Sequence, residues 1–232
     1  MRSAWYSLRP GGWRDYVTLL HPPYTAWHLS YVAIGAALAP RWRPDRMGWT
    51  LLAFGLAMGI GAHALDELRG RPLATRIPNA TLWTLAALSI GAAIVIGLVT
   101  AHRWTPWLYP AVAIGGFLVV AYNLELFGGR FHHDAAFALM WGAFPVLTAY
   151  LACAERLDAS PVVAAVFAAL LSHAQRRLST PVRELRRRAH DVPIDARAAA
   201  IEPVEAALRL LSAATVALAV ALVLARVRSG AG

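Results

Sequence analysis

Long apolar runs alternate with short polar segments along this chain. Most of these runs are long enough to cross a bilayer as helices, which takes about 20 residues, whereas the sixth is short enough to be a buried or re-entrant helix instead. The pattern predicts an all-α, polytopic transmembrane helical bundle over residues 21–232, with about seven spans. The expected spans lie at about 24–40, 47–66, 80–101, 105–124, 134–153, 160–174 and 204–226.

Residues 1–20 do not share this apolar pattern. Aromatic residues are interleaved with arginines there, which is typical of a segment that lies at the headgroup interface. We therefore expect an interfacial N-terminal segment ahead of the bundle.

Composition agrees with a membrane protein, since 58% of the residues are hydrophobic and 15% are charged. All 22 basic residues are arginines, and nearly all lie between the apolar runs, where they set orientation; this excludes a nucleic-acid partner. With the N-terminus inside, fourteen arginines fall in cytoplasmic segments and seven fall outside. We therefore expect a bacterial inner (plasma) membrane protein with a cytoplasmic N-terminus.

Chemistry-bearing residues concentrate where the second span ends. His63, Asp66 and Glu67 are three and four residues apart, so they share one side of a helix near its end. Arg69, Arg71 and Arg76 follow at once. We take His63, Asp66 and Glu67 as candidate catalytic residues, in a place that suits a metal ion, an anion, or both.

Other histidines fall on the same side of the predicted bundle. His28 lies about one and a half turns inside the first span, and His173 ends the sixth span with the same His-Ala pair as His63. Histidine nitrogen suits zinc or iron, whereas carboxylate oxygen suits Mg²⁺. We therefore expect a divalent metal held by His28, His63, Asp66 and His173. His132-His133-Asp134 is a candidate for half of a metal site, but adjacent histidines point in different directions on a helix, so we expect at most one of them to share a centre with His63.

Simpler interpretations remain open for each of these residues. Charges near the end of a span reach water at little cost, and a histidine inside a span can be a neutral group bonded to a neighbouring helix. The positive-inside rule accounts for most of the arginines between Arg176 and Arg197. Glu205 and Arg209, four residues apart in the last span, are expected to pair with each other.

Three segments resemble the UbiA superfamily of intramembrane aromatic prenyltransferases. They are Arg71-Pro-Leu-Ala-Thr-Arg-Ile-Pro, Tyr122-Asn-Leu-Glu-Leu and Trp141-Gly-Ala-Phe-Pro-Val-Leu, and the likeness covers roughly residues 20–190. The resemblance implies a helical bundle with a central cavity, where two Asp-rich loops hold Mg²⁺ and a prenyl diphosphate at the cytoplasmic mouth. Tyr122 and Asn123, by this likeness, and Arg71, Arg176 and Arg177, by position, are the candidate substrate-binding residues.

The chain departs from that family at the motifs that hold the metal. The first Asp-rich motif corresponds to His63-Ala-x-x-Glu67-x-x-x-Arg71, and the second to a segment with His173, Gln175, Arg176 and Arg177. Two classes of function stay open: a UbiA-like enzyme that acts on an isoprenoid or other lipid, and a metal-dependent membrane oxidoreductase. A third possibility is a protein that binds or transports lipid on the same scaffold without catalysis.

Overall fold

The computed structural model describes residues 4–187 and 193–230, and this part of the chain is helical without any strand. An apolar segment in a bilayer must satisfy its backbone hydrogen bonds within itself, which selects helices. The elements are α1 (Trp13–Leu19), α2 (Pro22–Leu38), α3 (Pro44–Phe54), η1 (Gly55–Ala62), α4 (His63–Leu68), α5 (Asn79–Arg103), α6 (Leu108–Asn123), α7 (Leu126–Gly129), α8 (Asp134–Phe137), η2 (Ala138–Ala143), α9 (Phe144–Ala154), α10 (Ala159–Arg187) and α11 (Ile194–Gly230).

Every predicted span is a helix. Within residues 4–187 and 193–230, four helical stretches are long and apolar enough to cross a membrane: Pro44–Leu68, Asn79–Arg103, Asp134–Ala154 and Ile194–Ser229. α2 and α6 have 17 and 16 residues, and α10 is 29 residues long and amphipathic. An all-helical bundle with four such helices is thereby established, while seven crossings and a UbiA-like arrangement stay predictions.

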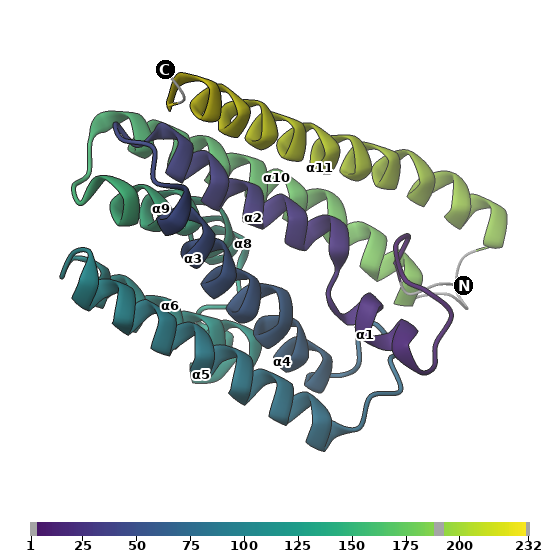
Figure 1. The fold of residues 1–232 in the computed structure, drawn as a ribbon. Coiled ribbons are helices and arrows are strands. Elements are labelled where there is room, and N and C mark those ends of the chain that lie inside the picture. The colour runs from purple at the N-terminus through teal and green to yellow at the C-terminus, as the bar shows by residue number, and fades with distance from the viewer. Residues whose placement is uncertain (1–3, 188–192, 231–232) are drawn as a thin grey trace.

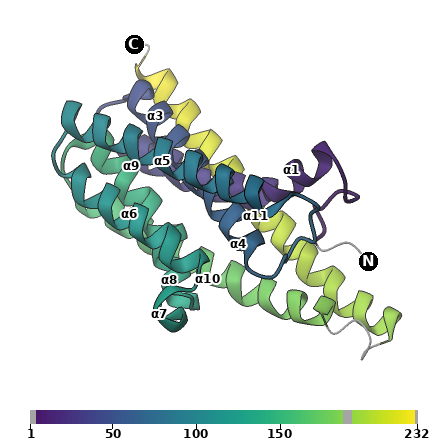
Figure 2. The same ribbon diagram turned by 90° about the horizontal axis from the view of Figure 1, so that it is seen from below.

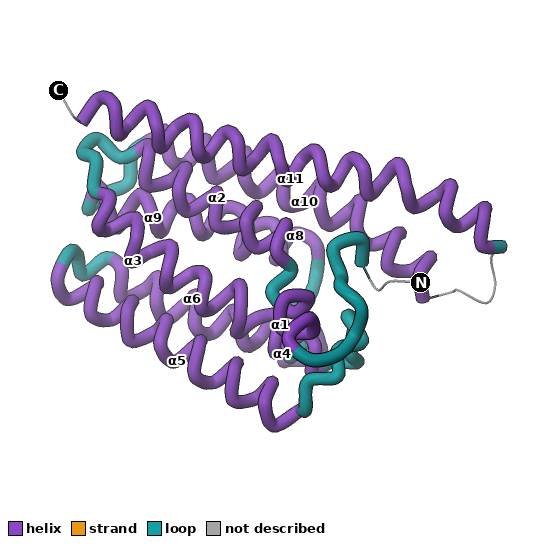
Figure 3. The backbone as a smooth tube through the Cα atoms, turned by 45° about the vertical axis from the view of Figure 1, so that its right-hand side comes forward, coloured by secondary structure: helices purple, strands orange, loops and turns teal. Residues whose placement is uncertain are grey.

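The long helices lie side by side and place their connecting loops toward two ends of the molecule (Figures 1 and 3). One end carries α1, the segment that joins α4 to α5, and the ends of α6 and α10; we call it the α1 end. The opposite end carries the turn between α5 and α6, the start of α10 and the C-terminus. In Figure 2 the helix α6 leads into α7 and α8, which lie next to α10.

Two stretches of π-helix interrupt the apolar helices: η1 lies between α3 and α4, and η2 lies between α8 and α9. η1 packs against α5, and η2 packs against α10. π-helical turns are rare, and they occur often at functional sites. His63 is the first residue after η1, and Trp141 belongs to η2.

One half of the core is built around α2, which packs against α9 and α11. Trp27 and Tyr31 are fully buried there, and the Trp27 indole donates a hydrogen bond of 2.6 Å to the Tyr31 hydroxyl. Ser172 of α10 donates to the same hydroxyl at 3.3 Å. These bonds join α2 to α10 and satisfy polar groups that would be costly to bury alone.

Candidate functional site

Polar side chains from five parts of the chain gather at the α1 end. Tyr6 and His21 come from the N-terminal segment, His63 and Asp66 from α4, Tyr122 from α6, and Arg176 and Arg183 from α10. His132 lies just ahead of α8. We call these eight residues the polar cluster.

His21 and His63 form the first contact of the cluster. Their rings stack, with centroids 4.1 Å apart, and the Tyr6 hydroxyl lies 2.7 Å from His21 Nδ1. Burial, and then the neighbouring His63, hold the pKa of His21 well below its usual 6.5, and burial raises the pKa of Tyr6. A neutral imidazole therefore faces an un-ionised phenol at neutral pH.

Three histidines in this region form hydrogen bonds to backbone carbonyls through the same ring nitrogen. His28, His63 and His132 each place Nδ1 near a backbone carbonyl, at 3.0 Å from Trp141, 3.1 Å from Gly59 and 3.1 Å from Tyr122, respectively. A carbonyl oxygen can only accept, so Nδ1 is the donor in each of these hydrogen bonds. Two of these carbonyls, those of Gly59 and Trp141, belong to the π-helices.

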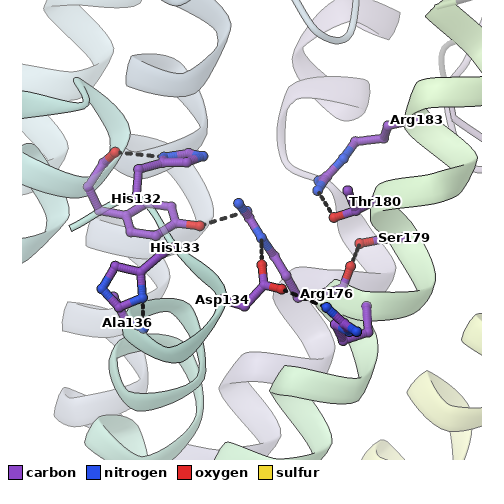
Figure 4. Close-up of polar contacts among 10 residues, drawn as sticks. His132, His133, Asp134, Ala136, Arg176, Ser179, Thr180 and Arg183 are labelled. Atoms are coloured by element: carbon purple, nitrogen blue, oxygen red, sulfur yellow. Dashed lines mark hydrogen bonds and ion pairs between the residues drawn. The ribbon is translucent and has the colours of Figure 1, made fainter. Parts of the chain in front are cut away.

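Arg176 joins α10 to α6 and α8. It donates to the Tyr122 hydroxyl at 2.7 Å and to an Asp134 oxygen at 3.1 Å, as Figure 4 shows. The Tyr122 ring stacks on His132 with centroids 4.4 Å apart. Arg183, two turns further along α10, hydrogen-bonds to Thr180. Figure 4 shows Arg183 and Arg176 reaching out from α10 on the side where His132 lies.

Asp66 is the carboxylate within this group. It is half-buried and lies within electrostatic range of Arg183, His132 and Arg176. Among residues 4–187 and 193–230, however, it accepts no hydrogen bond and forms no ion pair. A half-buried carboxylate without a partner is costly, which marks the place as one that a ligand can complete.

Several candidate residues instead hold the protein together. Glu67 is 0% exposed and accepts hydrogen bonds from the backbone of Leu73 and from both the backbone and the hydroxyl of Thr75. Arg71 donates to the Ile77 carbonyl at 2.6 Å and to the Asn79 side chain. Both side chains thus shape the segment between α4 and α5, and neither makes one of the contacts that join the polar cluster.

Asn123, Arg177 and His173 also lie apart from these contacts. The Asn123 side chain donates to the Val119 carbonyl one turn earlier. Arg177 is 72% exposed and reaches Asp134 only at 3.9 Å. His173 is exposed on α10, while its neighbour Ser172 faces the core.

The expected metal set is brought together only in part. His28, His63 and Asp66 lie in or beside the polar cluster, and His173 does not join them. Throughout residues 4–187 and 193–230, no three histidine, cysteine, aspartate or glutamate side chains are arranged to hold a metal ion. The residues present do not form a metal site as placed.

The predicted pairing of Glu205 with Arg209 is wrong. Glu205 pairs with Arg186 of α10 at 2.7 Å, and the Arg209 guanidinium lies over the Trp5 ring, 4.9 Å from its centroid. An i, i+4 pair is worth only a few tenths of a kcal/mol, roughly, so contacts with other elements displace it easily. Here they connect α11 to α10 and to the N-terminal segment.

An apolar cavity of about 120 Å³ lies beside the polar cluster, between α3, α5, α6 and α9. Its lining is almost entirely hydrophobic, and Trp141 belongs to it. The Trp141 ring also lies 5.8 Å from the Tyr122 ring and 6.5 Å from the His28 ring, measured between centroids. The cavity and the polar cluster therefore share a wall.

Sequence reasoning singled out five of the eight residues of the polar cluster, which are His63, Asp66, Tyr122, Arg176 and His132. Tyr6 and Arg183 were not singled out, and the stacking of His21 on His63 joins segments 42 positions apart. His21 lies at the start of the first expected span and His63 at the end of the second, which places both at the same end of the bundle but does not predict that their rings stack. No protein-family profile matches the chain, and no curated protein or solved structure matches it significantly.

Proposed function

We propose that this chain is an integral membrane protein that binds an isoprenoid or other lipid. The polar head of the lipid meets His63, Asp66 and their neighbours in the polar cluster, and its apolar chain lies against the cavity between α3, α5, α6 and α9. The observation that carries this proposal is the position of Trp141, which lines the cavity and packs beside Tyr122 and His28. A ligand with one polar and one apolar end matches that arrangement.

A lipid at this place reaches the protein from the bilayer. The helices that line the cavity also expose large apolar side chains elsewhere, such as Leu52, Leu88 and Ile114, which suit contact with lipid chains. Part of a chain can therefore occupy the cavity while the rest stays in the hydrocarbon. The relation to the UbiA superfamily, prenyl transfer and a bound divalent metal (Mg²⁺, iron or zinc) all stay predictions.

The proposal can be tested by filling the cavity with a larger side chain on α6. Ala111 lines it, and Ala113, two residues along α6, is exposed and does not. We expect Ala111→Phe to lose most of the lipid that co-purifies with the protein, whereas Ala113→Phe keeps it, because only the first ring displaces the chain. Mass spectrometry of the purified protein measures the lipid. Equal retention in both variants would contradict the proposed place of the chain.

The head-group end has its own test. The His63→Ala/Asp66→Ala double variant should bind lipid less tightly than the wild type, because it removes two polar contacts at the α1 end. Metal analysis of the wild-type protein, purified without added metal, decides between the enzymatic alternatives. Stoichiometric iron or zinc would favour an oxidoreductase, and a Mg²⁺-dependent rise in thermal stability with a prenyl diphosphate would favour prenyl transfer.

A further inference from the structure

The cavity between α3, α5, α6 and α9 runs lengthwise along these helices. Its lining residues recur at helical spacing, from Met140 and Trp141 to Ala152 on η2 and α9, and from Ile90 to Thr100 on α5. Trp141 and Ala152 are eleven positions apart, which is roughly 16 Å at the helical rise of about 1.5 Å per residue. A volume of about 120 Å³ spread over that length is narrow. The cavity therefore has room for one apolar chain and not for two.

Close contacts between the helices set the width of the cavity. Gly97 of α5 and Gly115 of α6 both line it. A Cβ on Gly97 would lie 2.5 Å from the Val112 side chain of α6, and one on Gly115 would lie 3.2 Å from the Phe144 ring of α9. The helix α3 in turn packs on α5 and on α9. Each of the four helices thus contacts its two neighbours around the cavity, and these contacts fix its width.

Trp104 closes the end of the cavity that lies farthest from the polar cluster. It follows α5, in the turn between α5 and α6 at the end opposite to α1 (Figure 1), and it lines the cavity. Its side chain packs against the buried residues Ala101, Leu108 and Ala152. The Arg46 guanidinium lies over its ring, 5.2 Å from the centroid.

Arg46 holds this end of the cavity in place. It donates a hydrogen bond of 2.8 Å to the Ala152 carbonyl and pairs with Glu155 at 2.8 Å. Its side chain is only 11% exposed, and a largely buried guanidinium over an indole is a favourable cation–π contact. Arg46 belongs to α3, Trp104 follows α5, and Glu155 follows α9. Three of the four wall helices are therefore joined around the Trp104 ring.

A cavity with a fixed width and a closed end selects chains by their length. An extended hydrocarbon chain advances about 1.25 Å per carbon, from bonds of about 1.5 Å at angles of about 111°, so about 13 carbons reach from the level of Trp141 to that of Ala152. A shorter chain leaves part of the cavity empty, and a longer chain overpacks it against Trp104. Building on the proposed function, we propose that the cavity takes a single apolar chain of about 13 carbons in extended length. Trp104 is the residue that sets this length.

The test compares lipids that differ only in chain length. The full-length protein, stripped of lipid in a neutral detergent, is incubated with an equimolar mixture of saturated 1-monoacylglycerols whose even-numbered chains have ten to twenty carbons. After removal of free lipid, mass spectrometry gives the bound share of each ester. We expect a maximum at twelve or fourteen carbons and an about tenfold lower share for the twenty-carbon ester, because added methylenes strain a filled cavity.

Variants at the closed end should move this maximum in opposite directions. Trp104→Ala removes the indole and should shift the maximum to sixteen carbons or more. Thr100→Leu adds apolar bulk to the lining one turn before Trp104 and should shift the maximum to shorter chains. Trp107→Ala is the matched control, because Trp107 lies in the same turn, is 69% exposed and is not a lining residue, and it should keep the wild-type maximum. Melting temperatures report whether each variant is folded, and Thr100→Leu decides alone if Trp104→Ala does not fold.

The outcomes distinguish this inference from the proposed function. A wild-type profile without a maximum, or a maximum that stays in place in the folded variants at Trp104 and Thr100, would overturn the selection by length and leave lipid binding intact. An equal shift in Trp107→Ala would overturn the role of Trp104. If the wild-type protein retains no ester, the inference fails, and the proposed function fails with it when Ala111→Phe also keeps its co-purified lipid.

Discussion

At the scale of single residues, neighbouring carboxylates of α4 have different environments. Asp66 is half-buried and has no direct partner in the described part of the chain, whereas Glu67 is fully buried and accepts three hydrogen bonds. Adjacent positions on a helix point about 100° apart, so one carboxylate faces the polar cluster and the other faces the segment after α4. The sequence shows two acidic residues at a helix end but not which is structural.

Substitution of Glu67 should therefore affect stability. Glu67→Gln replaces an acceptor of three bonds by an amide that also brings two donors, which leaves buried groups unpaired, and we expect a loss of about 3 kcal/mol in the free energy of unfolding. Denaturant unfolding in detergent measures it. Glu184→Gln, on the exposed face of α10, is the control and should stay within about 0.5 kcal/mol. A stable Glu67→Gln protein would indicate that the segment has another anchor.

At the scale of elements, glycine permits the closest helix contacts. A Cβ on Gly35 of α2 would lie 2.2 Å from the Val146 carbonyl oxygen of α9, and one on Gly142 of η2 would lie 2.5 Å from the Ala168 carbonyl oxygen of α10. These distances fall far below contact, and the opposing atoms are backbone. Both pairs of helices thus depend on the absence of a side chain, as is common between membrane helices.

The effect of a single methyl group should therefore depend on position. Gly35→Ala forces α2 away from α9, so we expect a loss of at least about 2 kcal/mol in the free energy of unfolding. Gly91→Ala, in α5, meets no atom within 4 Å and should be neutral or stabilising by about 0.5–1 kcal/mol, since alanine restricts the unfolded chain. Thermal unfolding of both variants checks this, and equal effects would contradict the close approach.

At the scale of the whole molecule, the sequence predicted the helices better than the site. Apolar runs specify helices because a bilayer allows few alternatives, and every predicted span is helical. The helix α10 continues to Arg187 through Pro181, beyond the predicted end at 174, because its amphipathic face packs on other helices. Contacts such as Arg176 with Tyr122 could not be predicted, since they depend on how helices distant in sequence lie together.

Seven crossings remain to be tested by labelling. In a Cys153→Ala background, single cysteines placed at Arg41, Arg130, Arg156 and Pro193 can be labelled with a membrane-impermeant maleimide. We expect Arg130 and Pro193 to lie on the cytoplasmic side, and Arg41 and Arg156 outside, because arginine is in excess at the α1 end. Labelling of Arg130 and Pro193 from opposite sides would mean that α10 does not cross.

The π-helix η1 changes the direction in which the side chains of α4 point relative to those of α3. An α-helix turns by about 100° per residue, and a π-helix turns by less because each hydrogen-bonded ring spans one more residue. Over the eight residues of η1 this deficit in rotation per residue accumulates. The side chains of His63 and Asp66 therefore point in a different direction from the one they would have if α3 continued as an unbroken α-helix. The widened turns therefore act as an angular offset, which lets the apolar face of α3 and the polar face of α4 be oriented independently along one continuous rod.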